Sequence, residues 1–160
     1  MDTVTADPAQ LAPIRDAFVE KIGLVAQAEG LPRSAGRIFG ALVFDGGAIA
    51  FGELAEGLQI SRATVSTSIR VLEERGLVQR VNRPGQRQDF FKMADDAYPT
   101  MLDGARKRSR QARDQIGATL SDLPPEAQDI RHRLERYSQF YEAISDCLGT
   151  AIDQVSKPRD

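Results

Sequence analysis

The chain has 160 residues, with 21 basic and 23 acidic side chains and a formal net charge of −2. That balance excludes a protein that coats nucleic acid over its whole surface, because such a protein needs a large positive excess. The single cysteine, Cys147, excludes an intramolecular disulfide and fits a reducing compartment, so we expect a cytoplasmic protein. The apolar stretch at 38–44 is far too short to span a bilayer, and we expect no membrane partner.

The hydrophobic pattern predicts a mainly α-helical fold with one small β-hairpin. Gly30 suits the end of the first helix, the Asp45-Gly46-Gly47 turn ends the second, and Ser61 is a good N-cap for the fourth. In chain order, the expected elements are helices at 10–28, 32–45, 51–58 and 61–75, strands at 77–82 and 88–93, and helices at 95–120 and 125–155.

We interpret this order as a winged helix-turn-helix core with dimerisation helices on both sides. The expected segments are a disordered N-terminus (1–9), an N-terminal dimerisation helix (10–30), a winged helix-turn-helix DNA-binding domain (31–94), C-terminal dimerisation helices (95–155) and a disordered tail (156–160).

The helix at 61–75 has two contrasting faces. Val65, Ile69 and Leu72 share the side that we expect to be buried. The opposite side is small and polar, with an arginine near each end, which suits a helix that enters a DNA major groove. Its candidate DNA contacts are Ser61, Arg62, Ala63, Thr64, Ser66, Thr67 and Arg70.

The segment that follows this helix predicts a wing. Its tip, "RPGQR", places Arg83 and Arg87 around a Pro-Gly turn. Arginines at such a tip are suited to a narrow minor groove, whose negative potential attracts them. We therefore add Arg83 and Arg87 to the candidate DNA contacts.

The chain resembles the MarR-type winged-helix transcription regulators in "LPRSAGRIFGALVF" (31–44), "ELAEGLQISRATVSTSIRVLEERGLVQRV" (53–81) and "PGQRQDFF" (84–91). It is most similar to the branch that includes the repressor of glycine-betaine synthesis. The resemblance implies a homodimer that binds a pseudo-palindromic operator, acts as a repressor and responds to a small organic ligand. Many relatives brace a wing arginine with an Asp-x-Arg pattern; here Asp89 is the acid that we expect to brace Arg87.

The last predicted helix carries apolar residues alternately four and three apart. This heptad pattern indicates helix packing, either on its own domain or, as we prefer, across a dimer. The expected dimer-interface residues are Leu134, Tyr137, Tyr141, Ile144 and Leu148. The candidates for an effector pocket are Phe39, Phe44, Tyr137, Phe140 and Tyr141, for which ordinary core packing is the alternative.

A second basic run, at 104–113, predicts either a solvated helix face or phosphate contacts. The lone histidine, His132, is expected on a helix surface, and Cys147 is expected as a small buried residue. No phosphate loop or zinc spacing is present, so we expect no enzyme, cofactor or metal. The alternative to a DNA-binding regulator is a winged-helix module for protein–protein assembly.

Overall fold

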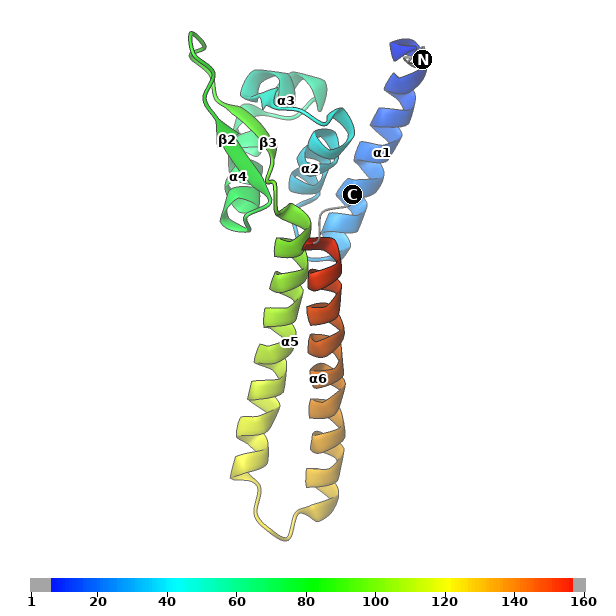
Figure 1. Ribbon diagram of the computed structural model, residues 1–160, viewed down its shortest axis with the longest axis vertical. Coiled ribbons are helices and arrows are strands. Elements are labelled where there is room, and N and C mark those ends of the chain that lie inside the picture. Colours follow the sequence, from blue (N-terminus) through cyan, green and yellow to red (C-terminus); the bar gives the residue numbers. More distant parts are fainter. Residues whose placement is uncertain (1–6, 157–160) are drawn as a thin grey trace. The chain divides into compact units, whose positions relative to one another are not determined.

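The computed structural model describes residues 7–156, which form two compact units that divide after Ala97. The first unit contains four helices and a small sheet, and the second contains two long helices (Figure 1). The elements are α1 (Pro8–Ala28), α2 (Arg33–Asp45), β1 (Ile49–Ala50), α3 (Phe51–Gly57), α4 (Arg62–Glu74), β2 (Val78–Val81), β3 (Phe90–Met93), α5 (Ala97–Asp122) and α6 (Gln128–Ser156).

The first helix begins earlier than its apolar pattern predicted. The Asp7 carboxylate accepts a hydrogen bond from the Ala9 backbone N–H at 3.0 Å, and Pro8 occupies the first turn. The expected disordered segment 1–9 is therefore wrong for Pro8 and Ala9, which are helical. At the other end, Ser156 is the last residue of α6 rather than part of a tail. Asp7, also in the expected segment 1–9, is the N-cap of α1, and residues 1–6 and 157–160 lie outside the described residues.

The predicted hairpin is part of a three-stranded antiparallel sheet with the order β1-β3-β2. β2 and β3 pair as expected, with Val78 opposite Met93 and Val81 opposite Phe90. The short strand β1 adds to the other edge of β3, where Ile49 lies opposite Phe91. The sequence indicated only a short apolar piece there, because two residues are too few to establish a strand period.

The core of the first unit lies between helices α2, α3 and α4 and the sheet. Ile38, Leu54 and Val65 each come from a different helix, and at most 1% of their surface is exposed. Phe91 closes this core from β3, also at 1% exposure. These contacts hold α4 and the β2–β3 wing on one framework, so the orientation of both depends on the same packed side chains.

The packing of α1 on α2 depends on a close backbone approach at Gly36. A Cβ atom at Gly36 would lie 2.4 Å from the Cβ atom of Ala26 and 2.8 Å from the backbone oxygen of Ile22. Both distances are far below van der Waals contact, and a backbone oxygen cannot move away without shifting α1. Glycine at this position therefore sets the separation of the two helices.

We expect Gly36→Ala to destabilise the protein by about 1–3 kcal/mol, because the added methyl group forces α1 away from α2. Gly57→Ala is the matched control, since no described atom beyond its own stretch of helix lies within 4 Å of the added Cβ there. At Gly57 the better helix propensity of alanine should leave stability unchanged or slightly raised. Urea unfolding of both variants measures the difference, and equal midpoints would contradict the close approach.

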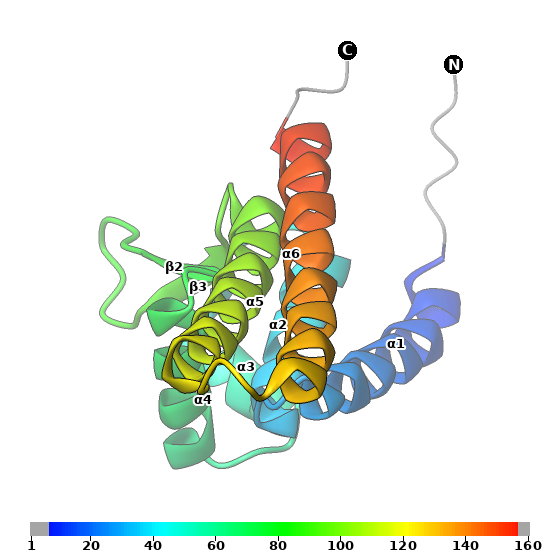
Figure 2. The same cartoon turned by 90° about the horizontal axis from the view of Figure 1, so that it is seen from below.

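The second unit is an antiparallel hairpin of α5 and α6, which lie side by side in both ribbon views (Figures 1 and 2). At its turn, the Arg131 guanidinium donates to the backbone oxygens of Leu120 and Leu123, each at 3.3 Å. Further along, the Arg106 guanidinium lies directly against Gly149. Within residues 7–156, no helix is long and apolar enough to cross a membrane.

Candidate nucleic-acid interface

Helix α4 has the two faces that its sequence predicted. Val65, Ile69 and Leu72 are buried, each with at most 2% of its surface exposed. Ser68 is also buried, and its hydroxyl shares a 2.7 Å hydrogen bond with the hydroxyl of Ser34 on α2. The opposite face is exposed except for the half-buried Thr64, and it carries the remaining predicted contacts, Ser61, Arg62, Ala63, Ser66, Thr67 and Arg70.

Three of the hydroxyls on this face already have partners inside the protein. Ser61 is the N-cap: its oxygen accepts from the Thr64 backbone N–H at 3.0 Å, and the two side-chain hydroxyls lie 2.7 Å apart. The Thr67 hydroxyl donates to the backbone oxygen of Ala63 at 3.0 Å. Its proton is therefore committed, and Thr67 can meet DNA only as an acceptor or through its methyl group.

Arg70 is the long cationic side chain at the C-terminal end of the outward face of α4. It is exposed and makes no hydrogen bond or ion pair with the described residues. Ser66 and Ala63, one and two turns before it, are short and leave the helix backbone accessible. This arrangement suits close entry into a groove, with Arg70 free to form a bidentate pair with a base.

The turn that leads into α4 is held by the backbone and by α2. Gln59 has a φ of 52°, a left-handed conformation that is uncommon for a glutamine. One residue earlier, the Leu58 backbone oxygen accepts from the Arg37 guanidinium at 2.9 Å. Arg37 also donates to Glu20 at 2.6 Å, so α1, α2 and the turn share one polar link.

The wing places its two predicted arginines differently. The Arg83 guanidinium lies over the ring of Phe90, 4.4 Å from its centroid, and thus covers the start of β3. Arg87 follows the tip, where Gly85 has a φ of 78°, and is exposed. Of the two, Arg87 is the one held by neither an ion pair nor a ring among the described residues.

The expected brace between Asp89 and Arg87 is wrong. The Asp89 carboxylate instead accepts from the Arg80 guanidinium at 3.0 Å, and the same guanidinium reaches Glu73 at 3.4 Å. The antiparallel pairing of the wing explains this choice, because it brings Arg80 and Asp89 to neighbouring positions on β2 and at the start of β3. Arg80 and Glu73 were absent from the predicted site, and nothing in their spacing signals the contact.

Arg62 and Arg80 also lie over aromatic rings. The Arg62 guanidinium is 4.7 Å from the ring centroid of Phe51, at the start of α3. That of Arg80 is 5.4 Å from the ring of Phe91. Such contacts limit the motion of an arginine without neutralising it, so Arg62 keeps its full charge at the N-terminus of α4.

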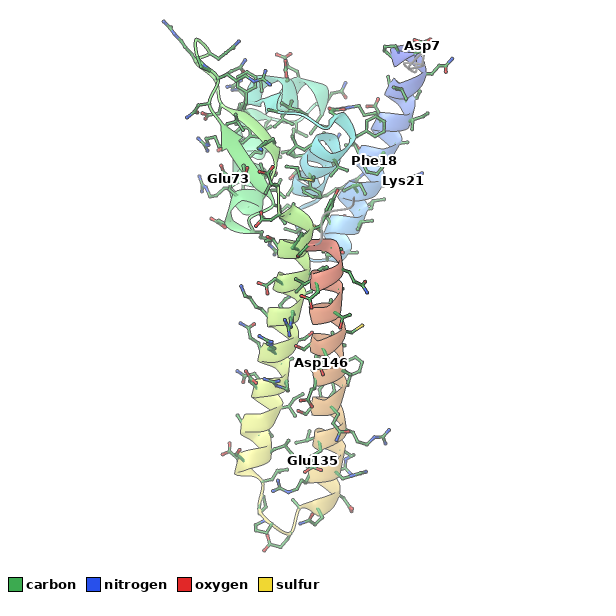
Figure 3. The ribbon with its side chains drawn as sticks, in the orientation of Figure 1. Asp7, Phe18, Lys21, Glu73, Glu135 and Asp146 are labelled. Carbon is green, nitrogen blue, oxygen red and sulfur yellow. The ribbon has the colours of Figure 1, made fainter. Side chains whose placement is uncertain are left out.

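The predicted dimer and pocket residues divide between the two units. Tyr137 is 51% exposed and Ile144 is half-buried, as are the other three predicted interface residues, Leu134, Tyr141 and Leu148. Of the pocket candidates, Phe39 packs against the first unit's core and Phe44 lies 5.7 Å from the ring of Phe18, which Figure 3 labels on α1.

The remaining pocket candidates, Tyr137, Phe140 and Tyr141, form an aromatic cluster on α6 with ring centroids 5.1–6.4 Å apart. The hydroxyls of the two tyrosines lie 3.0 Å apart, which raises the pKa of Tyr141. A pocket that uses both sets of aromatic residues stays a prediction.

The basic run on α5 is partly paired within its own helix. Lys107 lies 2.8 Å from Asp103, which holds the pKa of that carboxyl below its usual range, and Arg113 lies 2.9 Å from Asp114. This pairing is typical of a solvated helix face, although phosphate contact by the run stays a prediction. His132 is exposed as expected, but Cys147 is exposed rather than buried. Residues 7–156 contain no cluster of three potential metal ligands.

Comparison with known proteins identifies the family. A sequence profile of the MarR family matches residues 29–89, which run from just after α1 to just before β3. The HTH-type transcriptional regulator MmpR5 of Mycobacterium tuberculosis is 30% identical over 140 residues, which cover 82% of this chain and 83% of that protein. The chain belongs to the MarR family. This MarR-family protein is thus a DNA-binding transcriptional regulator, and the comparisons do not favour an assembly module.

Two further comparisons extend this assignment. A solved crystal structure of a transcriptional regulator is 27% identical, with a TM-score of 0.67, and the match covers 91% of this MarR-family chain and 100% of that chain. The HTH-type transcriptional repressor OpcR of Bacillus subtilis is 25% identical over 85 residues. That match covers 53% of this chain and 46% of the repressor, so it concerns about half of each protein.

Proposed function

We propose that this protein is a homodimeric repressor that recognises a pseudo-palindromic operator. The observation that carries the proposal is the outward face of α4, whose side chains are short and polar up to Arg70, a guanidinium with no ion-pair partner in residues 7–156. A surface built for protein assembly would present aromatic or aliphatic anchors there. The recognition residues that we propose are Ser61, Arg62, Ala63, Thr64, Ser66, Thr67 and Arg70 on α4, and Arg83 and Arg87 on the wing.

The geometry supports a division of labour among these residues. Arg70 and Ser66 are suited to base edges, because neither has a partner among the described residues. Ser61 and Arg62, at the N-terminus of α4, are suited to a phosphate, where free backbone N–H groups favour an anion. On the wing, Arg87 is suited to the minor groove and Arg83 to positioning the strand that follows.

The homodimer is supported by apolar side chains that one copy leaves exposed. On α1, Ile14 is 58% exposed and Val25 is 52% exposed. On α6, Tyr137 and Phe140 are 51% and 54% exposed. Exposed apolar groups gathered on two helices favour burial against a second copy. Twofold symmetry would also present two recognition helices to half-sites about 34–36 Å apart.

Four finer parts of the proposal have separate support. Repression is supported by the likeness to OpcR, which is named as a repressor, over about half of each chain. Membership of the branch that includes the repressor of glycine-betaine synthesis rests on the sequence resemblance alone, and so does a small organic effector. We place the protein in the cytoplasm because a regulator acts where its DNA lies.

Fluorescence anisotropy on the DNA upstream of the protein's own gene tests the proposed function. We expect that duplex to be preferred over a scrambled duplex by about 10³-fold or more. The affinity for both duplexes should fall with salt, because phosphate contacts release counterions. Equal affinity for the two duplexes would contradict recognition of this site, and absence of binding to either would contradict the proposal as a whole.

A further inference from the structure

Arg80 on β2 contacts both the end of α4 and the returning strand of the wing in the first unit. Its guanidinium donates to Asp89 at 3.0 Å and to Glu73 at 3.4 Å, and it covers the ring of Phe91. Glu73, labelled in Figure 3, belongs to the last turn of α4, and Asp89 precedes β3. One side chain therefore joins the recognition helix to both strands of the wing.

Asp89 extends this link to α3. Its backbone oxygen accepts from the Phe51 N–H at 2.9 Å, while its carboxylate holds Arg80. The Phe51 ring in turn packs 6.4 Å from the ring of Phe91. Asp89 thus fixes the end of the returning wing strand to the start of α3 and, through Arg80, to the end of α4.

The charges of this group are unusual for a surface that meets DNA. Glu73 and Asp89 together carry one negative charge more than Arg80 neutralises. The side chains are 30%, 45% and 50% exposed for Glu73, Asp89 and Arg80, so the excess acid is not buried. This excess negative charge should weaken binding to DNA, so the two carboxylates need another role to account for their position.

We propose that Arg80 is a positioning residue for DNA recognition, held by Glu73 and Asp89 so that the wing keeps a fixed orientation relative to α4. Two of the five N–H donors of Arg80 are taken by the carboxylates, and the proposal predicts that the remaining donors make no phosphate contact. Sequence preference requires α4 and the wing to engage adjacent grooves together, whereas nonspecific binding requires only positive charge. This inference rests on the proposed function, since it concerns the fit to a specific site.

The decisive variant is Asp89→Asn, which removes a negative charge from the DNA-binding unit. Simple electrostatics predicts tighter binding to any DNA, but the positioning role predicts weaker binding to the preferred site. We expect a loss of about two- to five-fold on a duplex that the wild-type protein selects from a random pool, as for the loss of one half-exposed ion pair. Affinity for a scrambled duplex should stay the same or rise.

Glu74→Gln is the matched control. It removes the same charge from the neighbouring position on α4, where Glu74 is exposed and has no ion pair with the described residues. We expect it to bind both duplexes as well as the wild type or better. Glu73→Gln repeats the test from the other side of Arg80 and replaces Asp89→Asn if that variant does not fold, as judged by thermal unfolding.

Two further measurements separate positioning from direct contact. Arg80→Gln should weaken binding to the selected duplex with an unchanged salt dependence, whereas loss of a phosphate contact would lower the slope by about 0.9. Without DNA, hydrogen exchange of the β2–β3 amides should be faster in Asp89→Asn than in Glu74→Gln, because the wing has lost its link to α4.

The inference is overturned if Asp89→Asn binds the selected duplex as tightly as Glu74→Gln does, if its wing amides exchange no faster, or if Arg80→Gln lowers the salt slope. A wild-type protein that selects no sequence from the pool would overturn the proposed function as well. That result appears before any variant is compared, so the two failures are distinguishable.

Discussion

Replacing Arg70 by alanine is expected to cost about 1–3 kcal/mol of binding free energy on the preferred DNA site, with a smaller loss on unrelated DNA. Arg70 ends the outward face of α4, and its guanidinium is free of partners among residues 7–156. Other polar groups on that face are partly committed, since Ser61 caps the helix and Thr67 donates to Ala63. We therefore expect Arg70 to make the largest contribution to base recognition.

Arg75→Ala is the control for Arg70→Ala. Arg75 follows α4 as its C-cap residue, is exposed, and lies off the face that carries Arg70. Its loss removes one positive charge and should weaken binding to all duplexes by a similar, small factor. Anisotropy titrations of both variants on the selected and scrambled duplexes measure the difference. If Arg70→Ala lost equal affinity on both, the side chain would contact only the DNA backbone.

Helix periodicity predicted the faces of α4 correctly because burial follows from spacing along one element. Val65, Ile69 and Leu72 repeat at helical intervals, and every one of them is in the core. The wing was predictable for a similar reason, since Pro84-Gly85 between two apolar runs is a local turn signal. The sequence thus predicted the features that depend on one element and its immediate neighbours in the chain.

The sequence did not predict which side chains pair with each other, because the pairing depends on the fold. Asp89 is two residues from Arg87 and nine from Arg80, yet strand pairing brings the more distant arginine to the carboxylate. Strand β1 was not predicted, because its ladder hydrogen bonds are made with β3, about 40 residues later in the chain. Cys147 was assigned to an apolar seam by its neighbours, but its own position on α6 faces away from burial.

Gly36 and Gly40 on α2 also show what the sequence could not predict, which is how closely α1 approaches each of them. Gly36 and Gly40 lie four residues apart on one face of α2, a spacing that is typical of close helix packing. The structure adds the partner and the degree: a Cβ atom at Gly40 would lie 3.1 Å from Ile22, whereas one at Gly36 would meet the Ile22 backbone oxygen at 2.8 Å. Only the second distance excludes any side chain, which is why the stability test uses Gly36.

Replacing Tyr137 by glutamate is expected to convert the proposed homodimer to monomers. Tyr137 is 51% exposed on α6 and stacks with Phe140 at 6.4 Å between ring centroids. An aromatic residue of this kind is a candidate hot spot, and a charge in its place would be buried unpaired when two copies associate. We expect the dimer dissociation constant to rise at least about 30-fold, since a hot spot contributes about 2 kcal/mol or more.

Gln139→Glu is the control for Tyr137→Glu, because it adds the same negative charge at an exposed position of α6 outside the apolar seam. Light scattering across a dilution series should give monomers for Tyr137→Glu at concentrations where the wild type and Gln139→Glu remain dimers. The operator affinity of Tyr137→Glu should also fall, because a monomer binds each half-site on its own. An intact Tyr137→Glu dimer would move the proposed interface to α1, where Ile14→Glu is the next variant to measure.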